Sequence, residues 1–285
     1  MSICTVKDFS DVTMDQVEAF WDARPCNIRH SLREVGSLEY FKEVEARKYL
    51  VEPHIPAFAQ FERWKDKKVL EVGCGIGTDT INFARAGAKV TAIDYSEKSL
   101  EIARRRAEVY GLSIDFYKVN AEEISRVVPV EQYDLVYSFG VIHHTPHPDR
   151  AVCEIRKFMG PGSELKIMVY HRYSWKTFWI LMTYGGGVFW KIDELIARYS
   201  EAQTGCPVTY TYTKKSIKEM LEGFEVLESK AEHIFPYRIA DYKAYRYKKV
   251  WYFRYLPRQV FRWMEQKLGW HLCVTARASS LTRSI

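Results

Sequence analysis

From Lys67 to Tyr170 the chain alternates between short apolar runs and longer amphipathic stretches, in units of about 20 to 30 residues. Strands that alternate with helices join through right-handed crossovers, which place the strands parallel in one sheet. The alternation therefore predicts an α/β fold with a doubly wound, Rossmann-like sheet. The expected strands are 68–72, 89–94, 114–120, 133–139 and 165–170, and the expected helices are 78–88, 96–111, 121–128 and 149–159.

Outside residues 67–170 the alternation of short apolar runs and amphipathic stretches is lost. Residues 1–66 are expected to form a helical and irregular lid segment, ahead of a domain over 67–285. After Tyr170 we expect a Trp/Tyr-rich helical insertion at about 171–206 and a second insertion at about 232–268. The remaining expected elements are a helix over 213–224, a strand near 224–227 and a last strand over 271–275.

Composition limits the class of protein. Hydrophobic residues make 47% of the chain and charged residues 27%, which is typical of a globular domain and excludes disorder. No apolar run is long enough to span a membrane, and the acidic start does not match a signal peptide, so a cytoplasmic location is expected. The six cysteines are far apart and include no CxxC pair, so we expect reduced thiols and no metal site.

Positive charge is concentrated in one segment, residues 237–267. It holds nine Lys/Arg against two acids and ten aromatic residues, whereas the rest of the chain is close to neutral. Three partners can cover so much apolar surface: the lid of the protein's own site, a second subunit of a homodimer, or an anionic membrane surface. Packing with 171–200 and the N-terminal helices as a roof is preferred, through Trp251, Tyr252, Tyr255 and Trp263. Nucleic acid is the least favoured partner.

A glycine loop lies between the first strand and the first helix. Gly73, Gly75 and Gly77 follow Glu71 at every second position, so the backbone can approach a ligand and helix N–H groups are exposed to it. Asp94, at the end of the second strand, can accept hydrogen bonds from both hydroxyls of a ribose. Together these features indicate a site for an adenosine-containing ligand.

The dinucleotide fingerprint GxGxxG fails here, because Thr78 or Thr80 stands where its last glycine should be. No Gly-Lys-Ser/Thr follows, so the Walker A pattern fails too. The pattern ExGxGxG instead resembles the first motif of class I S-adenosylmethionine-dependent methyltransferases of the small-molecule type. The resemblance continues over about 67–170, through Asp94-Tyr95-Ser96, Asn120-Ala121, the strand 133–139 and the turn Pro161-Gly162-Ser163.

This resemblance implies a seven-stranded sheet in the order 3-2-1-4-5-7-6 with the last strand antiparallel, and S-adenosyl-L-methionine as the cofactor. It also implies that lids are built from the N-terminal region and the two insertions. The residues expected at the cofactor are Glu71, Gly73, Cys74, Gly75, Gly77, Asp94, Tyr95, Asn120, Ala121, Ser138 and Phe139.

Candidates for the acceptor side follow the strands that end at the same edge of the sheet. His143 and His144 come after the fourth strand, where a histidine can take an acceptor proton near neutral pH or hold the loop through backbone carbonyls. Methyl transfer needs such a base only if the acceptor must lose a proton. The candidates for substrate binding are Arg24, Cys26, Asn27, Arg29, Tyr170 and His171.

The sequence therefore predicts methyl transfer to a small-molecule acceptor in a lidded, aromatic pocket. A lipid or quinone-like acceptor at a membrane surface is one alternative, and RNA or protein is another. The Asn-Pro-Pro-Tyr-type motif of enzymes that methylate base amines is missing, since Ser138-Phe139-Gly140 stands in its place. A non-catalytic module that only binds S-adenosylmethionine is the alternative outside enzymes.

Overall fold

A single mixed sheet organises the chain. The computed structural model describes residues 8–186, 188–201 and 203–279, so Cys4 and two positions of the first insertion, 187 and 202, lie outside it. Seven strands form the sheet in the order β3-β2-β1-β4-β5-β7-β6, as the resemblance implied. The strands are β1 (Lys68–Val72), β2 (Lys89–Asp94), β3 (Asp115–Lys118), β4 (Tyr133–Phe139), β5 (Met159–Tyr170), β6 (Phe224–Glu232) and β7 (His271–Ala278).

The direction of the last strand is also confirmed. β1 pairs in parallel with β2 and with β4, and β4 pairs in parallel with β5. β7 runs antiparallel to both of its neighbours, β5 and β6. The carboxyl ends of the parallel strands therefore meet at one edge, which is where ligands bind in sheets of this kind.

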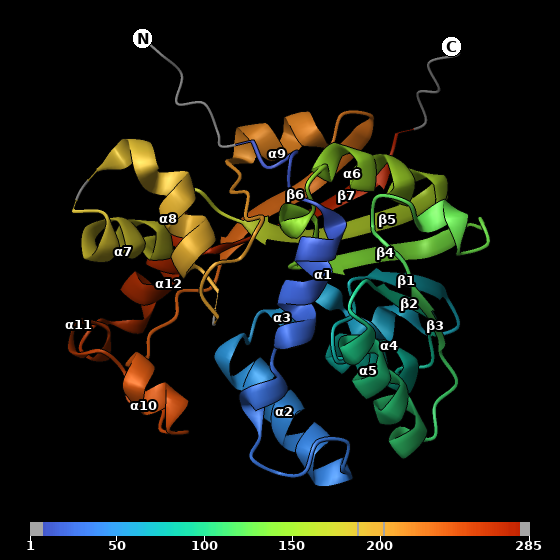
Figure 1. Ribbon diagram of the computed structural model, residues 1–285, viewed down its shortest axis with the longest axis horizontal. Coiled ribbons are helices and arrows are strands. Elements are labelled where there is room, and N and C mark those ends of the chain that lie inside the picture. The colour runs from blue at the N-terminus through green and yellow to red at the C-terminus, as the bar shows by residue number, and fades with distance from the viewer. Residues whose placement is uncertain (1–7, 187, 202, 280–285) are drawn as a thin grey trace.

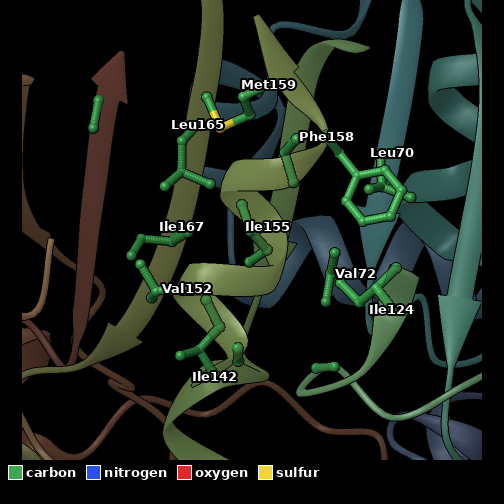
Figure 2. Packing of buried hydrophobic residues seen from close by; sticks show 14 of the residues in the cluster. Leu70, Val72, Ile124, Ile142, Val152, Ile155, Phe158, Met159, Leu165 and Ile167 are labelled. Carbon is green, nitrogen blue, oxygen red and sulfur yellow. The ribbon is translucent and has the colours of Figure 1, made fainter. Parts of the chain in front are cut away.

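Helices cover both faces of the sheet (Figure 1). α4 (Thr78–Arg85) and α5 (Glu97–Tyr110) pack on one face, and α6 (Pro148–Lys157) and α9 (Lys214–Met220) pack on the other. Successive strand residues point to opposite faces, so Val69 packs in the core under α4 and α5, and Leu70 packs in the core under α6 and α9. Figure 2 shows Val152 and Ile155 of α6, and Phe158 just after it, against the side chains of β1 and β5.

Local signals fix the ends of α5 as expected. The Ser96 side chain accepts a hydrogen bond from the Ser99 N–H at the start of the helix. Gly111 ends it at a φ of 64°, a left-handed conformation that glycine adopts without strain.

Three expectations about elements were wrong. β5 begins at Met159 rather than Leu165, so the expected turn Pro161-Gly162-Ser163 lies inside the strand, because its pairing with β4 starts at the pair Tyr133 and Met159 and shifts register before the pair Leu135 and Glu164. The predicted helix over 121–128 is only a 3-10 turn, Ile124–Arg126, because the Asn120 side chain accepts the Glu122 N–H and Glu154 accepts the Ser125 N–H. β6 extends to Glu232 rather than ending near Leu227. As an edge strand with one partner, β6 tolerates exposed polar residues, so its apolar pattern is weak.

The remaining helices come from the N-terminal region and the insertions. None of the described helices is both long and apolar enough to cross a membrane. The α-helices are α1 (Met14–Ala23), α2 (Leu38–Val51), α3 (Ile55–Ala59), α7 (Trp175–Tyr184), α8 (Ile192–Tyr199), α10 (Ile239–Lys243), α11 (Trp251–Arg254) and α12 (Arg258–Leu268). Further 3-10 turns are η1 (Ile28–His30), η2 (Phe61–Trp64), η4 (Ile142–His144) and η5 (Phe189–Lys191).

The basic aromatic segment 237–267 packs on both neighbours that the sequence suggested. The Trp175 ring of α7 lies 5.6 Å from the Phe253 ring, and the Arg47 guanidinium of α2 lies 4.2 Å from the Tyr242 ring centre. Its largest aromatic residues, however, do not supply buried area as expected. Trp251 and Trp263, in α11 and α12, are 73% and 58% exposed, and Tyr255, just after α11, is 75% exposed.

Candidate functional site

A cavity of about 220 Å³ lies at the carboxyl edge of β1, β2, β4 and β5. Its floor is formed by the loops that follow these strands, and α1 and the loop after it complete the wall. Of the residues predicted from sequence, it is lined by Cys26, Asn27, Gly73, Cys74, Gly75, Asp94, Tyr95, Asn120, Ala121, Phe139, His144 and Tyr170. The cavity thus joins most of the predicted cofactor residues to part of the predicted acceptor side.

The glycine loop is held tightly against the end of β2. The N–H groups of Gly73 and Cys74 both donate to the Ile93 carbonyl, at 2.8 and 2.9 Å. At Gly73 the φ is 79°, and a Cβ there would stand 2.1 Å from a methyl group of Val141. Glycine is therefore required at this position by the backbone and by the loop that follows β4.

Asp94 connects the glycine loop to α5. One carboxylate oxygen accepts the Gly75 N–H at 2.7 Å, and the other accepts the Ser96 N–H at 2.9 Å. Burial raises the pKa of Asp94, and hydrogen bonds from the N–H groups of Ser96 and Gly75 oppose that shift. Each carboxylate oxygen can accept more than one hydrogen bond, so both remain able to receive a hydroxyl donor from the cavity.

The loop after β3 forms the next part of the cavity wall. Asn120 and Ala121 line it, and the Asn120 side-chain oxygen accepts the Glu122 N–H at 2.9 Å. Glu122 in turn accepts the His147 N–H at 2.9 Å. This chain of contacts fixes the loop after β3 relative to the loop after β4.

His144 presents an unpaired nitrogen at the cavity. Its Nδ1 lies 2.7 Å from the Val208 carbonyl, which can only accept, so Nδ1 carries the hydrogen and Nε2 keeps its lone pair. Nε2 has no hydrogen-bond partner among the described residues and lies 3.9 Å from a Glu201 carboxylate oxygen. Burial lowers the pKa of His144, so the imidazole is neutral and can take a proton.

His143 lies behind this wall rather than on it. It is fully buried, and its ring centre is 3.9 Å from that of Tyr170. Neither ring nitrogen has a hydrogen-bond partner among the described residues, and burial lowers its pKa well below the ordinary value. The two histidines that the sequence treats alike therefore have different positions.

Tyr170 and Glu201 form a hydrogen-bonded pair beside His144. The Tyr170 hydroxyl donates to Glu201 at 2.7 Å, and burial raises the pKa of Tyr170 well above its ordinary value, so it stays protonated. Trp21 of α1 completes this wall, with its ring centre 5.2 Å from that of His144. The arrangement offers two acceptors, His144 Nε2 and the Glu201 carboxylate, between two aromatic side chains.

Seven predicted residues do not line the cavity. Glu71 is buried under the glycine loop, and desolvation followed by repulsion from Asp79 raises its pKa to about 8, so it is protonated at neutral pH. Arg29 is exposed, and its carbonyl accepts the Tyr245 hydroxyl at 2.8 Å. The others are Arg24, Gly77, Ser138, His143 and His171.

Sequence reasoning missed several lining residues, among them Trp21, Lys48, Glu52, Glu201 and His271. Lys48 pairs with Asp79 at 2.7 Å, and Asp79 also accepts the Tyr49 and Tyr137 hydroxyls. None of these five residues belongs to a motif, and they come from segments far apart in the chain. Only the antiparallel direction of β7 could have placed His271 near the site, because β7 then begins where β5 ends.

Comparison with known protein families gives a match over the central part of the chain. Residues 69–162 match the family model described as a methyltransferase domain. The ubiquinone biosynthesis O-methyltransferase of Dechloromonas aromatica is 33% identical over 106 residues, which are 37% of this chain and 45% of that protein. The chain thus spans less than half the length of this curated relative.

Solved structures resemble the chain over nearly its whole length. The magnesium protoporphyrin IX methyltransferase of Synechocystis, described with bound SAH, has a TM-score of 0.57 at 16% identity and covers 94% of this chain and 100% of its own. The [4+2]-cyclase SpnF has a TM-score of 0.53 at 19% identity and covers 93% and 96%. At these identities the likeness shows the fold alone. Residues 69–162 therefore match a methyltransferase domain, and the chain has the seven-stranded fold expected from its resemblance to class I S-adenosylmethionine-dependent methyltransferases.

Proposed function

We propose that this protein binds S-adenosylmethionine and transfers its methyl group to a hydroxyl oxygen of a small aromatic acceptor. One observation carries the proposal: a single cavity is lined on one side by the glycine loop and Asp94 and on the other by His144 and Tyr170. The names of curated relatives, which are O-methyltransferases, support oxygen as the acceptor atom.

The side of the cavity formed by the glycine loop and Asp94, here called the cofactor wall, would bind and orient the cofactor. When bound, S-adenosylmethionine supplies a methyl group on a positively charged sulfur. Asp94 would receive the ribose hydroxyls, and Gly73, where a Cβ would meet Val141, lets the loop keep the conformation that lines the cavity. Alignment of two reactants in this way can lower a barrier by roughly 7–11 kcal/mol.

The opposite side, formed by Trp21, His144, Tyr170 and Glu201 and here called the acceptor wall, would prepare the attacking oxygen. His144 Nε2 would take the proton of the acceptor hydroxyl, so that its oxygen could receive the methyl group that S-adenosylmethionine supplies when bound. The Nδ1–H bond to Val208 holds the ring and stabilises the imidazolium that forms. Trp21 and Tyr170 would flank an aromatic ring, with the hydroxyl between His144 and Glu201.

Two measurements test this function in turn. Calorimetry should show binding of S-adenosylmethionine and S-adenosylhomocysteine and none of NAD; the reverse would overturn the cofactor. Incubation with isotope-labelled methyl donor and cell extract should then label a small metabolite. Binding without any label transfer would favour a non-catalytic module or other chemistry, a possibility that the cyclase among the fold neighbours makes concrete.

A second candidate is an acceptor taken from a membrane surface, such as a lipid or quinone-like molecule. Trp190, Trp251 and Trp263 are 75%, 73% and 58% exposed, on the side of the molecule that carries α7, α8, α11 and α12 (Figure 1). Arg254, Arg258 and Arg262, which are also exposed, lie between the last two in the sequence. Exposed Trp with bases suits an anionic lipid interface.

Flotation with vesicles tests this second candidate. Each basic residue near an anionic surface contributes about 1 kcal/mol, so binding to acidic vesicles should be released by high salt. The absence of binding would leave a water-soluble acceptor as the proposal. Of the described residues in 171–200 and 237–267, none lines the cavity, so the expectation that these segments roof it is wrong. Protection of 237–267 from protease by cofactor and acceptor is therefore not expected.

A further inference from the structure

Three histidines and a glutamate lie together beside the cavity, at the edge where β6 ends and β7 begins. His271 is the first residue of β7, and His233 directly follows β6. His54 precedes α3, and Glu52 follows α2. The mechanism proposed above uses none of them, although Glu52 and His271 both line the cavity.

The donor atoms of Glu52, His233 and His271 converge. One ligand atom from each of the three lies within 4.8 Å of the other two. His271 Nε2 is 3.7 Å from a Glu52 carboxylate oxygen, while its Nδ1 is 3.0 Å from His54 Nε2. Histidines that bind metals commonly use one nitrogen for the ion and donate from the other to an orienting partner. His271 has this arrangement, with His54 as the partner.

The backbone of His233 is held in an uncommon conformation. Its φ is 70°, in the left-handed region that residues other than glycine seldom adopt, and its carbonyl accepts the Trp270 N–H at 2.8 Å. This turn brings the His233 ring to 4.7 Å from the His271 ring. Strained residues persist where the surrounding structure requires the side chain in one place, and they concentrate at functional sites.

We propose that Glu52, His233 and His271 bind a divalent transition metal ion of the zinc type. Two imidazoles and one carboxylate are a donor set that suits zinc and its neighbours and leaves positions open. Ligands in a tetrahedral zinc site are about 3.4 Å apart, so the most distant pair would move together on binding. The ion would thereby join the end of α2, which carries Glu52, to the paired strand ends that carry His233 and His271.

Nearby charges leave the carboxylate of Glu52 available to the ion. Lys48 is paired with Asp79 at 2.7 Å. The ammonium of Lys176 lies 4.7 Å from the centre of the Trp270 ring.

Metal binding to the full chain, without methyl donor, tests the proposal independently of methyl transfer. Chelator-treated protein is titrated with Co²⁺ while visible absorption is followed, and Zn²⁺ is then added to compete. The expected result is one equivalent of Co²⁺ bound in a site of low coordination number and displaced by Zn²⁺. Failure of the protein to bind Co²⁺ or Zn²⁺ would overturn the proposal, whatever the outcome for S-adenosylmethionine.

Variants separate this site from adventitious binding. Glu52→Gln and His233→Ala should weaken metal binding by about 100-fold or more, and His54→Ala, which removes only the orienting partner, by roughly 10-fold. His147→Ala removes a histidine outside the cluster and should bind like the wild type. His233→Cys should retain binding, because a thiolate is also a zinc ligand. Equal affinity in the wild type, Glu52→Gln and His233→Ala would overturn the assignment, with circular dichroism confirming that each variant is folded.

Discussion

The two walls of the cavity are built in different ways. The cofactor wall is made by three loops that each follow a parallel strand, and its groups are mostly backbone atoms or the Asp94 carboxylate bonded to them. The acceptor wall is made by single side chains, such as Trp21, His144 and Glu201, from segments far apart in the chain. The first wall is fixed by local sequence, and the second exists only once the sheet and its insertions have assembled.

This difference predicts which properties a substitution on each wall will change. Substitution on the cofactor wall disturbs a backbone conformation and should affect ligand affinity and stability together. Substitution on the acceptor wall alters one side chain in a frame that other residues hold. It should therefore affect turnover alone, which is how a fold of this kind can serve many acceptors.

The largest effect is expected on the acceptor wall. His144→Gln should lower kcat by about 100- to 10,000-fold, the range for loss of a general base, while the Kd for S-adenosylmethionine stays the same. The wild-type rate should persist below pH 6.5, because burial lowers the pKa of His144 and the ring stays neutral there. The measurement is kcat against pH on the acceptor found by methyl labelling.

His143→Gln is the matched control for that experiment. Its ring lies behind Tyr170 and does not line the cavity, so it should change stability more than turnover. If both variants keep full turnover, no base is needed, as for an acceptor that is already anionic. If His143→Gln has the larger loss, the assignment of the base to His144 is wrong.

On the cofactor wall, Asp94→Ala should weaken S-adenosylmethionine binding by about 2–4 kcal/mol, the scale of hydrogen bonds to a charged group. The loss includes the Gly75 and Ser96 contacts that hold the loop. Calorimetry measures it, and S-adenosylhomocysteine should lose affinity equally. An unchanged Kd would remove Asp94 from the cofactor site and with it the distinction between the walls.

Gly73→Ala should lower the free energy of unfolding by about 2–3 kcal/mol, since its Cβ would meet Val141 at 2.1 Å. Gly75→Ala is the control: its φ is also positive, at 53°, but no atom lies within 4 Å of the added Cβ, so about 1 kcal/mol is expected. Urea unfolding measures both. Val141→Ala should recover part of the loss at Gly73, and equal losses at the two glycines would contradict the close contact.

The same contrast explains what the sequence could predict. The glycine loop and Asp94 could be predicted because each depends on neighbours in the chain, namely a strand, a turn and the acid at a strand end, whereas the strand order was implied only by the resemblance to a family. Glu201 and His271 could not, because nothing near them in sequence distinguishes them from other polar residues. The cysteine spacing likewise gave no reason to expect a metal, whereas the cluster of Glu52, His233 and His271 forms only through the pairing of β6 with β7.

The smallest effect is expected where the two walls join. Asp22, at the end of α1, accepts the Ser96 hydroxyl and, at 3.3 Å, the Lys98 N–H, so it attaches the segment that carries Trp21 to the start of α5. A carboxylate at a helix N-terminus contributes about 1 kcal/mol through such bonds and the helix dipole. Asp22→Ala should therefore lower the free energy of unfolding by about 1 kcal/mol, measured by urea unfolding. Asp11 is an exposed acid that precedes α1, so Asp11→Ala should change the free energy of unfolding much less. Equal losses would mean that α1 is held over the cavity by its apolar contacts alone.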